Sequence, residues 1–157
     1  MRELRQGKPA NRNRGDSVTV TECVNHIRHL ENEISFKQRQ RAELFEMLTS
    51  ITAPLSEAVQ STSEDKVSSL VAQYVDLSNE IIDTYRRKFN AENEFHALAA
   101  QLPPQWEELL LLRYLSGMTF ENISAEMGYS REWCWKTNNK ARTALQDLLD
   151  KKERQKS

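Results

Sequence analysis

The chain has 157 residues, which is enough for one or two domains. It has only four glycines and four prolines, and its apolar residues recur at helical spacing, so the sequence predicts an all-α protein. No apolar run reaches the ~18 residues of a membrane span, and the basic start lacks the apolar stretch of a signal peptide. Cys23 and Cys134 are too far apart to indicate a disulfide framework. We therefore expect a cytoplasmic protein with no membrane association.

Residues 1–16 are polar and aperiodic, and they predict a disordered basic arm. Residues 1–15 carry five basic residues against Glu3 alone, and residues 130–157 carry eight bases against four acids. Positive charge at both ends of the sequence favours phosphate binding. The alternative for the arm is a solvated tail with no partner.

Residues 17–101 predict two long helices. The first is expected to start near Asp16 or Ser17 and to end before Pro54, with 54–65 as the connector. Its apolar stripe begins with Val24, Ile27, Leu30 and Ile34.

The second long helix is expected to begin at a Ser63 cap. A seam follows at spacings of three and four, formed by Val67, Leu70, Tyr74, Leu77 and Ile81 and extended less strictly through Tyr85, Phe89, Phe95 and Leu98. Neither helix can bury its stripe alone, so the two should pack as an antiparallel hairpin, pair between subunits as a coiled coil, or do both. We assign 17–101 to oligomerisation, with a dimer favoured, or to partner docking.

Residues 102–150 predict three shorter helices joined by two tight turns, after a boundary at Pro103–Pro104. The expected helices are Gln105–Leu115, a second capped by Thr119, and a third capped by Ser130 that runs from Arg131 to about Leu149. Gly117 and Gly128 supply the turns. This is the pattern of a helix-turn-helix DNA-binding domain, and residues 151–157 follow it as a charged tail.

The third helix carries polar, basic and aromatic residues on the face opposite its apolar side. Arg131 can bind guanine, Glu132 can accept from cytosine, Asn139 can pair with adenine, and Lys136 and Lys140 suit bases or phosphates. We predict that these residues, with the caps, bind double-stranded DNA: Thr119, Ser130, Arg131, Glu132, Trp135, Lys136, Asn139 and Lys140.

The sequence offers little for catalysis or for a cofactor. Cys23, His26 and His29 are three residues apart on one helix, but consecutive side chains at this spacing point in progressively different directions around the helix. No fourth ligand is evident either. No phosphate-binding glycine loop or nucleophile–base pair is present. We expect neither enzymatic activity nor a metal or cofactor.

Residues 102–145 resemble region 4 of bacterial sigma-70-type factors, which reads the −35 promoter element. The matching residues are Leu102-Pro103, Leu109-Leu110, Leu112-Arg113-Tyr114, Gly117, Ile123-Ser124, Gly128, Ser130-Arg131-Glu132 and Lys140-Ala141. The resemblance implies base reading by Arg131, Glu132 and the positions of Trp135 and Lys136. Trp133, Trp135 and Asn138-Asn139 depart from the pattern, so the preferred DNA sequence need not be a −35 hexamer.

The chain beyond the arm also resembles the small region-4-like proteins of phages and prophages of Gram-positive bacteria, including late-transcription and autolysin-regulator-like groups. The segments that carry this resemblance are ITAPLSEAVQSTSEDKVSSLVAQYVDL and RYLSGMTFENISAEMGYS. No segment resembles sigma region 2, which melts the −10 element. The resemblance thus implies a regulator that is not a complete sigma factor.

We therefore expect a phage-encoded, sequence-specific transcription regulator, with RNA polymerase as a candidate second partner. One alternative is the small packaging (terminase) subunit of a phage, which also combines a helix-turn-helix with helical oligomerisation segments. Another is a helical adaptor that binds only proteins of the transcription machinery, through Leu111, Trp133 and Trp135.

Overall fold

The computed structural model describes residues 18–52 and 60–156 and confirms the all-α prediction for them, since they contain no strand. The helices are α1 (Val20–Thr52), α2 (Gln60–Ala99), α3 (Pro104–Leu110), a π-helical turn η3 (Leu111–Leu115), α4 (Phe120–Met127) and α5 (Arg131–Lys156). No described helix is long and apolar enough to cross a membrane.

Two compact units share these helices. One, the hairpin unit, is His26–Ala91. The other, the terminal unit, combines Met1–Asn25 with Glu92–Ser157, and its described part starts at Val18. This division differs from the one expected at residues 17 and 102, because the first turns of α1 and the last turns of α2 belong to the unit that contains α5.

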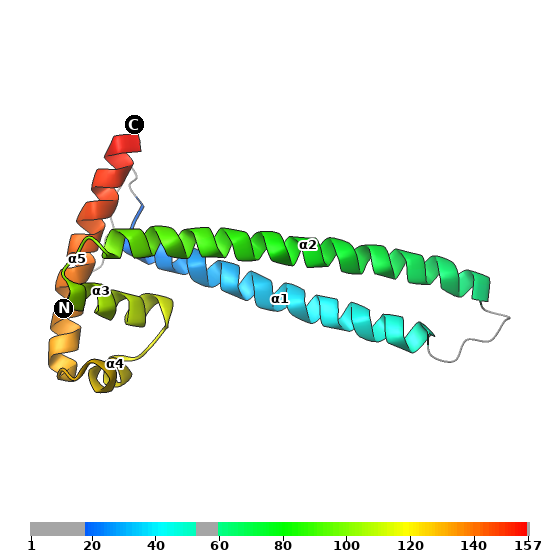
Figure 1. The fold of residues 1–157 in the computed structure, drawn as a ribbon, viewed down its shortest axis with the longest axis horizontal. Coiled ribbons are helices and arrows are strands. Elements are labelled where there is room, and N and C mark those ends of the chain that lie inside the picture. Colours follow the sequence, from blue (N-terminus) through cyan, green and yellow to red (C-terminus); the bar gives the residue numbers. More distant parts are fainter. Residues whose placement is uncertain (1–17, 53–59, 157) are drawn as a thin grey trace, which may run out of the picture. The chain divides into compact units, whose positions relative to one another are not determined.

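The hairpin unit consists of the facing parts of α1 and α2, which run antiparallel side by side (Figure 1). The expected inner seam of α2 is present, with Leu70 and Ile81 buried and the positions between them half-buried. Its predicted extension was partly wrong: Phe95 and Leu98 are buried as expected, whereas Tyr85 and Phe89 are 47% and 62% exposed. Strict three-four spacing from Ile81 leads to Thr84, which is fully buried, so the two aromatic residues lie beside the seam.

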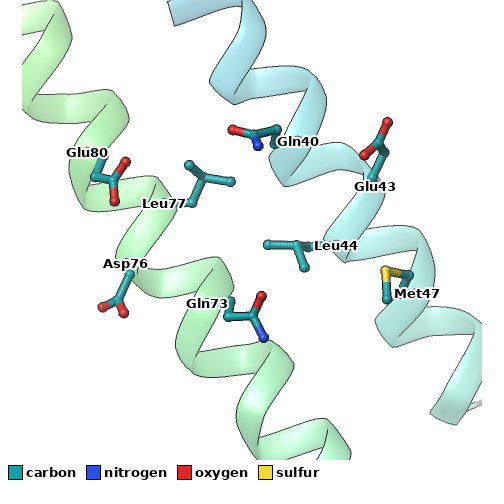
Figure 2. Close-up of a pocket in the computed structure, with 8 residues that line it drawn as sticks. All are labelled: Gln40, Glu43, Leu44, Met47, Gln73, Asp76, Leu77 and Glu80. Carbon is teal, nitrogen blue, oxygen red and sulfur yellow. The ribbon is translucent and has the colours of Figure 1, made fainter.

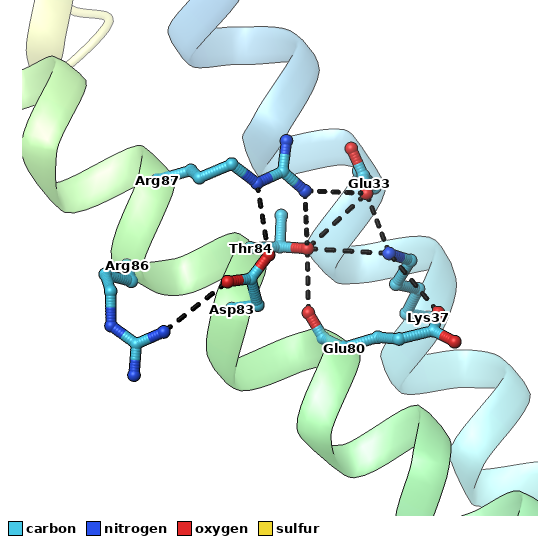
Figure 3. A network of polar contacts seen from close by, with 7 residues as sticks. All are labelled: Glu33, Lys37, Glu80, Asp83, Thr84, Arg86 and Arg87. Atoms are coloured by element: carbon cyan, nitrogen blue, oxygen red, sulfur yellow. Dashed lines mark hydrogen bonds and ion pairs between the residues drawn. The ribbon is translucent and has the colours of Figure 1, made fainter.

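A polar network joins the two helices where the seam reaches Thr84 (Figure 3). Glu33 Oε2 accepts from Lys37 Nζ at 2.7 Å, and from Thr84 Oγ1 and Arg87 Nη2, both at 3.4 Å. The hydrogen bond from Lys37, more than any other contact, lowers the pKa of Glu33, and the same bond raises the pKa of Lys37. Buried Thr84 is thus satisfied by partners on both helices, which fixes the register of the hairpin.

Closer to the connector the helices leave a hollow that is open to solvent (Figure 2). Leu44 of α1 and Leu77 of α2 lie inside it, and the other lining residues are mainly polar: Gln40, Glu43, Met47, Gln73, Asp76 and Glu80. The acidic, open lining gives no apolar enclosure for a ligand.

Two helix starts differ from those expected. α1 begins at Val20 rather than near Ser17, because Thr19 Oγ1 accepts from the Glu22 amide at 3.1 Å while Glu22 Oε1 accepts from the Thr19 amide at 3.0 Å. This reciprocal pair is a capping box. α2 begins at Gln60, so the expected cap, Ser63, lies inside the helix.

The shorter helices of the terminal unit enclose a small core. α3 and α4 both pack on α5, and Leu109, Ile123 and Cys134, one from each of these helices, are fully buried together. Around them pack Leu112, Met118, Phe120, Met127 and Trp133. α5 continues to Lys156, seven residues beyond its expected end, so most of the expected charged tail is helical.

Candidate nucleic-acid interface

The first turn, between η3 and α4, is held by backbone conformation and by Arg113. Gly117 adopts φ +71°, as expected of a residue that must reverse the chain. Arg113 Nη1 donates to the Met118 carbonyl at 3.0 Å, and its guanidinium carbon lies 4.1 Å from the centroid of the Phe120 ring. These contacts tie the end of η3 to the start of α4.

Thr119 caps α4 as predicted. It is extended (φ −75°, ψ 159°), and its Oγ1 accepts from the Asn122 amide at 3.1 Å. Its hydroxyl therefore already satisfies a helix N-terminus, and the exposed side chain lies outside the face of α5 that carries the other predicted DNA-binding residues.

The second turn connects α4 to α5. Gly128 ends α4 at φ +80°, and its amide donates to the Ser124 carbonyl at 2.9 Å. Ser130 then caps α5, with Oγ accepting from the Trp133 amide at 3.0 Å. The caps and both left-handed glycines were predicted correctly, since each follows from local turn chemistry.

α5 separates its residues into two sides. Its buried side includes Cys134, Ala141, Leu145 and Leu149, as predicted. All six predicted base or phosphate contacts on α5 are exposed, and 3.6 residues per turn places them within about half the circumference. They are Arg131, Glu132, Trp135, Lys136, Asn139 and Lys140. We call this the exposed face of α5.

One ion pair lies on this face. Lys136 Nζ is 2.8 Å from Glu132 Oε2, one helical turn away, and both side chains are well exposed. Such a pair contributes about 0–1 kcal/mol, so it is easily exchanged for contacts with a ligand. It also orients both side chains along the helix.

The tryptophans of α5 have different environments. Trp135 is 54% exposed on the exposed face. Trp133 is half-buried against the core and stacks on Tyr129, with ring centroids 3.8 Å apart and an interplanar angle of 15°. The expectation that both are available to a partner is therefore corrected for Trp133, whose ring is used in closing the second turn.

The buried side contains two polar residues, Thr137 and Asn138. Asn138 Nδ2 donates to the Tyr114 hydroxyl at 3.1 Å, and Arg142 Nη1 donates to the same oxygen at 3.4 Å. Tyr114 also meets Phe95 edge-on, with centroids 6.3 Å apart. The network couples α5 to η3 and to the last turns of α2, and it shows why those turns belong to the terminal unit.

Comparison with known families agrees with this geometry. Residues 92–145 match the family model for sigma-70, region 4. The match begins at Glu92, where the second segment of the terminal unit also begins. It indicates a DNA-binding helix-turn-helix domain in this part of the chain. No curated protein and no solved structure matches the chain.

Sequence reasoning missed two residues that shape the domain. Arg113 gave no local signal, because its role depends on a turn five residues away. Gln146 holds the chain before α1: its Oε1 accepts from the Val20 amide at 2.9 Å, and its Nε2 donates to the Val18 carbonyl at 3.0 Å. A contact across 126 residues leaves no trace in local spacing, although the Thr-x-x-Glu capping box at Thr19 was visible in the sequence.

Proposed function

We propose that the protein is a sequence-specific DNA-binding transcription regulator whose α5 enters the major groove. The observation that carries the proposal is the exposed face of α5, which presents base-competent side chains immediately after a capped helix N-terminus. In helix-turn-helix proteins the first residues of this helix contact base edges. The region 4 match supports the same orientation.

Within this proposal the residues divide into two roles. Arg131 and Glu132 in the first turn bind bases, and Trp135, Lys136 and Asn139 contact bases or sugars further along. Lys140 lies another turn away and contacts phosphate. Loss of a base contact by Arg131 would cost about 1–3 kcal/mol at one base pair, whereas loss of Lys140 would weaken binding to all sequences alike.

The test is selection of duplex DNA from a random pool by the purified full chain at ~150 mM salt, which suppresses unspecific phosphate binding. The proposal predicts one enriched motif that loses a defined base preference with Arg131→Ala. Lys140→Gln should retain the motif with lower affinity. Enrichment of no motif, or a motif unchanged by Arg131→Ala, contradicts the assignment.

We further propose that the hairpin unit forms a homodimer through a second, outer seam of α2. Val71, Val75, Ile82, Tyr85 and Phe89 are 44–62% exposed and repeat at spacings of four, seven, three and four. An antiparallel second copy related about residue 80 would place Val71 opposite Phe89 and Val75 opposite Tyr85, with Ile82 opposite Ser78. A stripe of this kind is rare on monomeric proteins.

Sedimentation velocity distinguishes the outcomes. The wild type is expected to sediment as a dimer, and Ile82→Glu as a folded monomer. The matched control Gln73→Glu adds the same charge away from the seam and should leave the dimer intact. A monomeric wild type contradicts the dimer proposal, and a large ring would favour the packaging-subunit alternative.

The narrower resemblances complete the proposal. We propose a phage or prophage origin and RNA polymerase as a second partner on the basis of the resemblance, and a cytoplasmic location on the basis of the DNA-binding domain. The protein-only adaptor is weakened because Trp133, one of its three expected contacts, is stacked on Tyr129. Absence of DNA binding even at low salt would restore it.

A further inference from the structure

The outer seam of α2 is bordered by side chains of α1. Gln38 Nε2 donates to the Tyr85 hydroxyl at 3.2 Å, and Arg41 Nη1 donates to Ser78 Oγ at 3.3 Å. Gln38, Arg41 and Phe45 follow one another on α1 at spacings of three and four, so they form one row along that helix. We call the outer seam together with this row the two-helix face of the hairpin unit.

Phe45 extends the apolar part of the two-helix face onto α1. It is 55% exposed, and its ring centroid lies 6.3 Å from that of Tyr74 on α2. Arg41 lies over the same Tyr74 ring, with its guanidinium carbon 5.8 Å from the centroid. The row on α1 is thus held against α2 by contacts within the hairpin unit, which gives the face a defined shape before any partner binds.

Ser78 completes the outer seam. It is half-buried and lies three residues after Val75 and four before Ile82, in the gap that the exposed apolar residues leave. With Ser78 the seam repeats at spacings of four, three, four, three and four, which is the heptad repeat by which two helices pack together. Its members are Val71, Val75, Ser78, Ile82, Tyr85 and Phe89.

The completed seam is complementary to itself in the antiparallel direction. About a two-fold axis level with residue 80, each of its three smaller side chains lies opposite a larger one, and facing positions that combine small and large residues interdigitate. The pairs are Val71 with Phe89, Val75 with Tyr85, and Ser78 with Ile82. A parallel copy would instead place each residue opposite itself. Because an interface about a two-fold axis uses the same patch on both subunits, the seam fits a second copy of this chain.

The same axis brings the row on α1 against its own copy. α1 and α2 run antiparallel, and the bond between Arg41 and Ser78 sets these two residues at about the same level. Residue 80 of α2 is therefore level with a point between Gln38 and Arg41. The nearest member of the opposite row to Arg41 is Gln38 of the second copy, whose amide oxygen can accept from the guanidinium. The antiparallel arrangement thus pairs a cation with a neutral acceptor.

We propose that the two-helix face binds a second, antiparallel copy of this chain as a four-helix bundle, and that the dimer binds an inverted repeat of one DNA half-site. The two-fold axis relates the two copies of the exposed face of α5 as it relates the two hairpins, and a two-fold protein matches two-fold DNA. The inference rests on the proposed function and on the dimer of α2. It adds the contribution of α1, the orientation of the two copies and the symmetry of the DNA site.

The first experiment measures the orientation of the copies by pulsed electron paramagnetic resonance. A spin label is attached to a Lys66→Cys variant in a Cys23→Ser background, since Lys66 is exposed and Cys134 is buried. Residue 66 precedes residue 80 by fourteen positions, so an antiparallel bundle separates the two labels by about 42 Å along α2. A parallel bundle brings them within about 20 Å. That result, or the absence of dipolar coupling, overturns the proposed bundle.

The second experiment tests the contribution of α1 through the dissociation constant of the dimer. Gln38→Lys places a charge close to Arg41 of the other copy, so the constant should rise about tenfold or more. Gln40→Lys is the matched control, because it makes the same substitution on the same helix in the hollow of Figure 2. It should leave the constant within about twofold. Helical circular dichroism checks that both variants are folded, and equal effects of the two would remove α1 from the interface.

The third experiment reads the symmetry of the DNA site by selection from a random pool. Wild type and Gln73→Glu should both enrich two copies of one sequence in inverted orientation. Ile82→Glu, as a monomer, should enrich one copy of that sequence with lower affinity. A direct repeat or a single half-site enriched by a dimeric wild type overturns the inverted repeat.

The outcomes separate this inference from the proposed function. A wild type that forms the antiparallel bundle and binds no DNA even at low salt overturns the proposed function and with it the inverted repeat, while the bundle stands. A wild type that binds a specific sequence as a monomer overturns the bundle and the inverted repeat, while the proposed function stands.

Discussion

Tyr114→Phe should destabilise the terminal unit through one buried amide. Asn138 is 5% exposed, and its Nδ2 has the Tyr114 hydroxyl as its partner at 3.1 Å. Removal of that hydroxyl leaves a buried donor without a bond, which costs about 1–3 kcal/mol. Arg142 retains its bond to Thr21, so its loss is smaller. For a unit of this size, each kcal/mol lowers the melting temperature by about 4–8 °C.

Tryptophan fluorescence isolates the relevant unit, because Trp106, Trp133 and Trp135 all lie in Glu92–Ser157. Tyr129→Phe is the matched control: the Tyr129 ring stacks on Trp133, and its hydroxyl makes no hydrogen bond with the described residues. The control should change the unfolding free energy by less than about 0.5 kcal/mol.

A double variant strengthens the test. Replacing both partners of a buried hydrogen bond by apolar groups is close to neutral, so Tyr114→Phe with Asn138→Leu should cost about 1 kcal/mol less than the sum of the two single variants. Additive costs, or a Tyr114→Phe variant as stable as Tyr129→Phe, would refute the assignment of this bond as a support of α5.

Three further predictions concern the turns, the hairpin and the thiols. Gly128→Ala should cost about 1–2 kcal/mol in the same fluorescence assay; a Cβ there meets no atom, so the cost comes from φ +80°, and an unchanged melting point would exclude a left-handed cap. Because the folded pKa of Glu33 is lowered, its carboxylate stabilises the hairpin at neutral pH, and this contribution disappears as the pH falls through the folded pKa. Helical circular dichroism during heating should thus show Glu33→Gln less stable than wild type at pH 7 and equal to it in acid; a difference independent of pH would contradict the network. Burial raises the pKa of Cys134, so in a Cys23→Ser variant the remaining thiol should react with a disulfide reagent only as fast as the terminal unit opens, and immediate reaction would place it at the surface.

The sequence predicted best what depends on local chemistry. Thr119, Gly117, Gly128 and Ser130 occupy the positions expected of them, because caps and left-handed turns follow from a few neighbouring residues. The buried side of α5 followed from its spacing in the same way.

Features that depend on distant parts of the chain were missed or misplaced. Whether Tyr85 and Phe89 are buried depends on which of two adjacent stripes of α2 faces α1. The stripe that does so contains Thr84, which is stabilised by Glu33, 51 residues away. The domain boundary was expected at Pro103, where local structure breaks. Packing of Phe95 on Tyr114 instead extends the terminal unit back to Glu92.

The central claim, that the exposed face of α5 binds bases in the major groove, is tested most directly by methylation interference on the selected duplex. Methylation of guanine N7 marks the major groove, and methylation of adenine N3 marks the minor groove. The account predicts that N7 methylation at particular guanines of the motif blocks binding, and that Arg131→Ala removes the sensitivity at one of them. Binding that tolerates N7 methylation throughout the motif would contradict it.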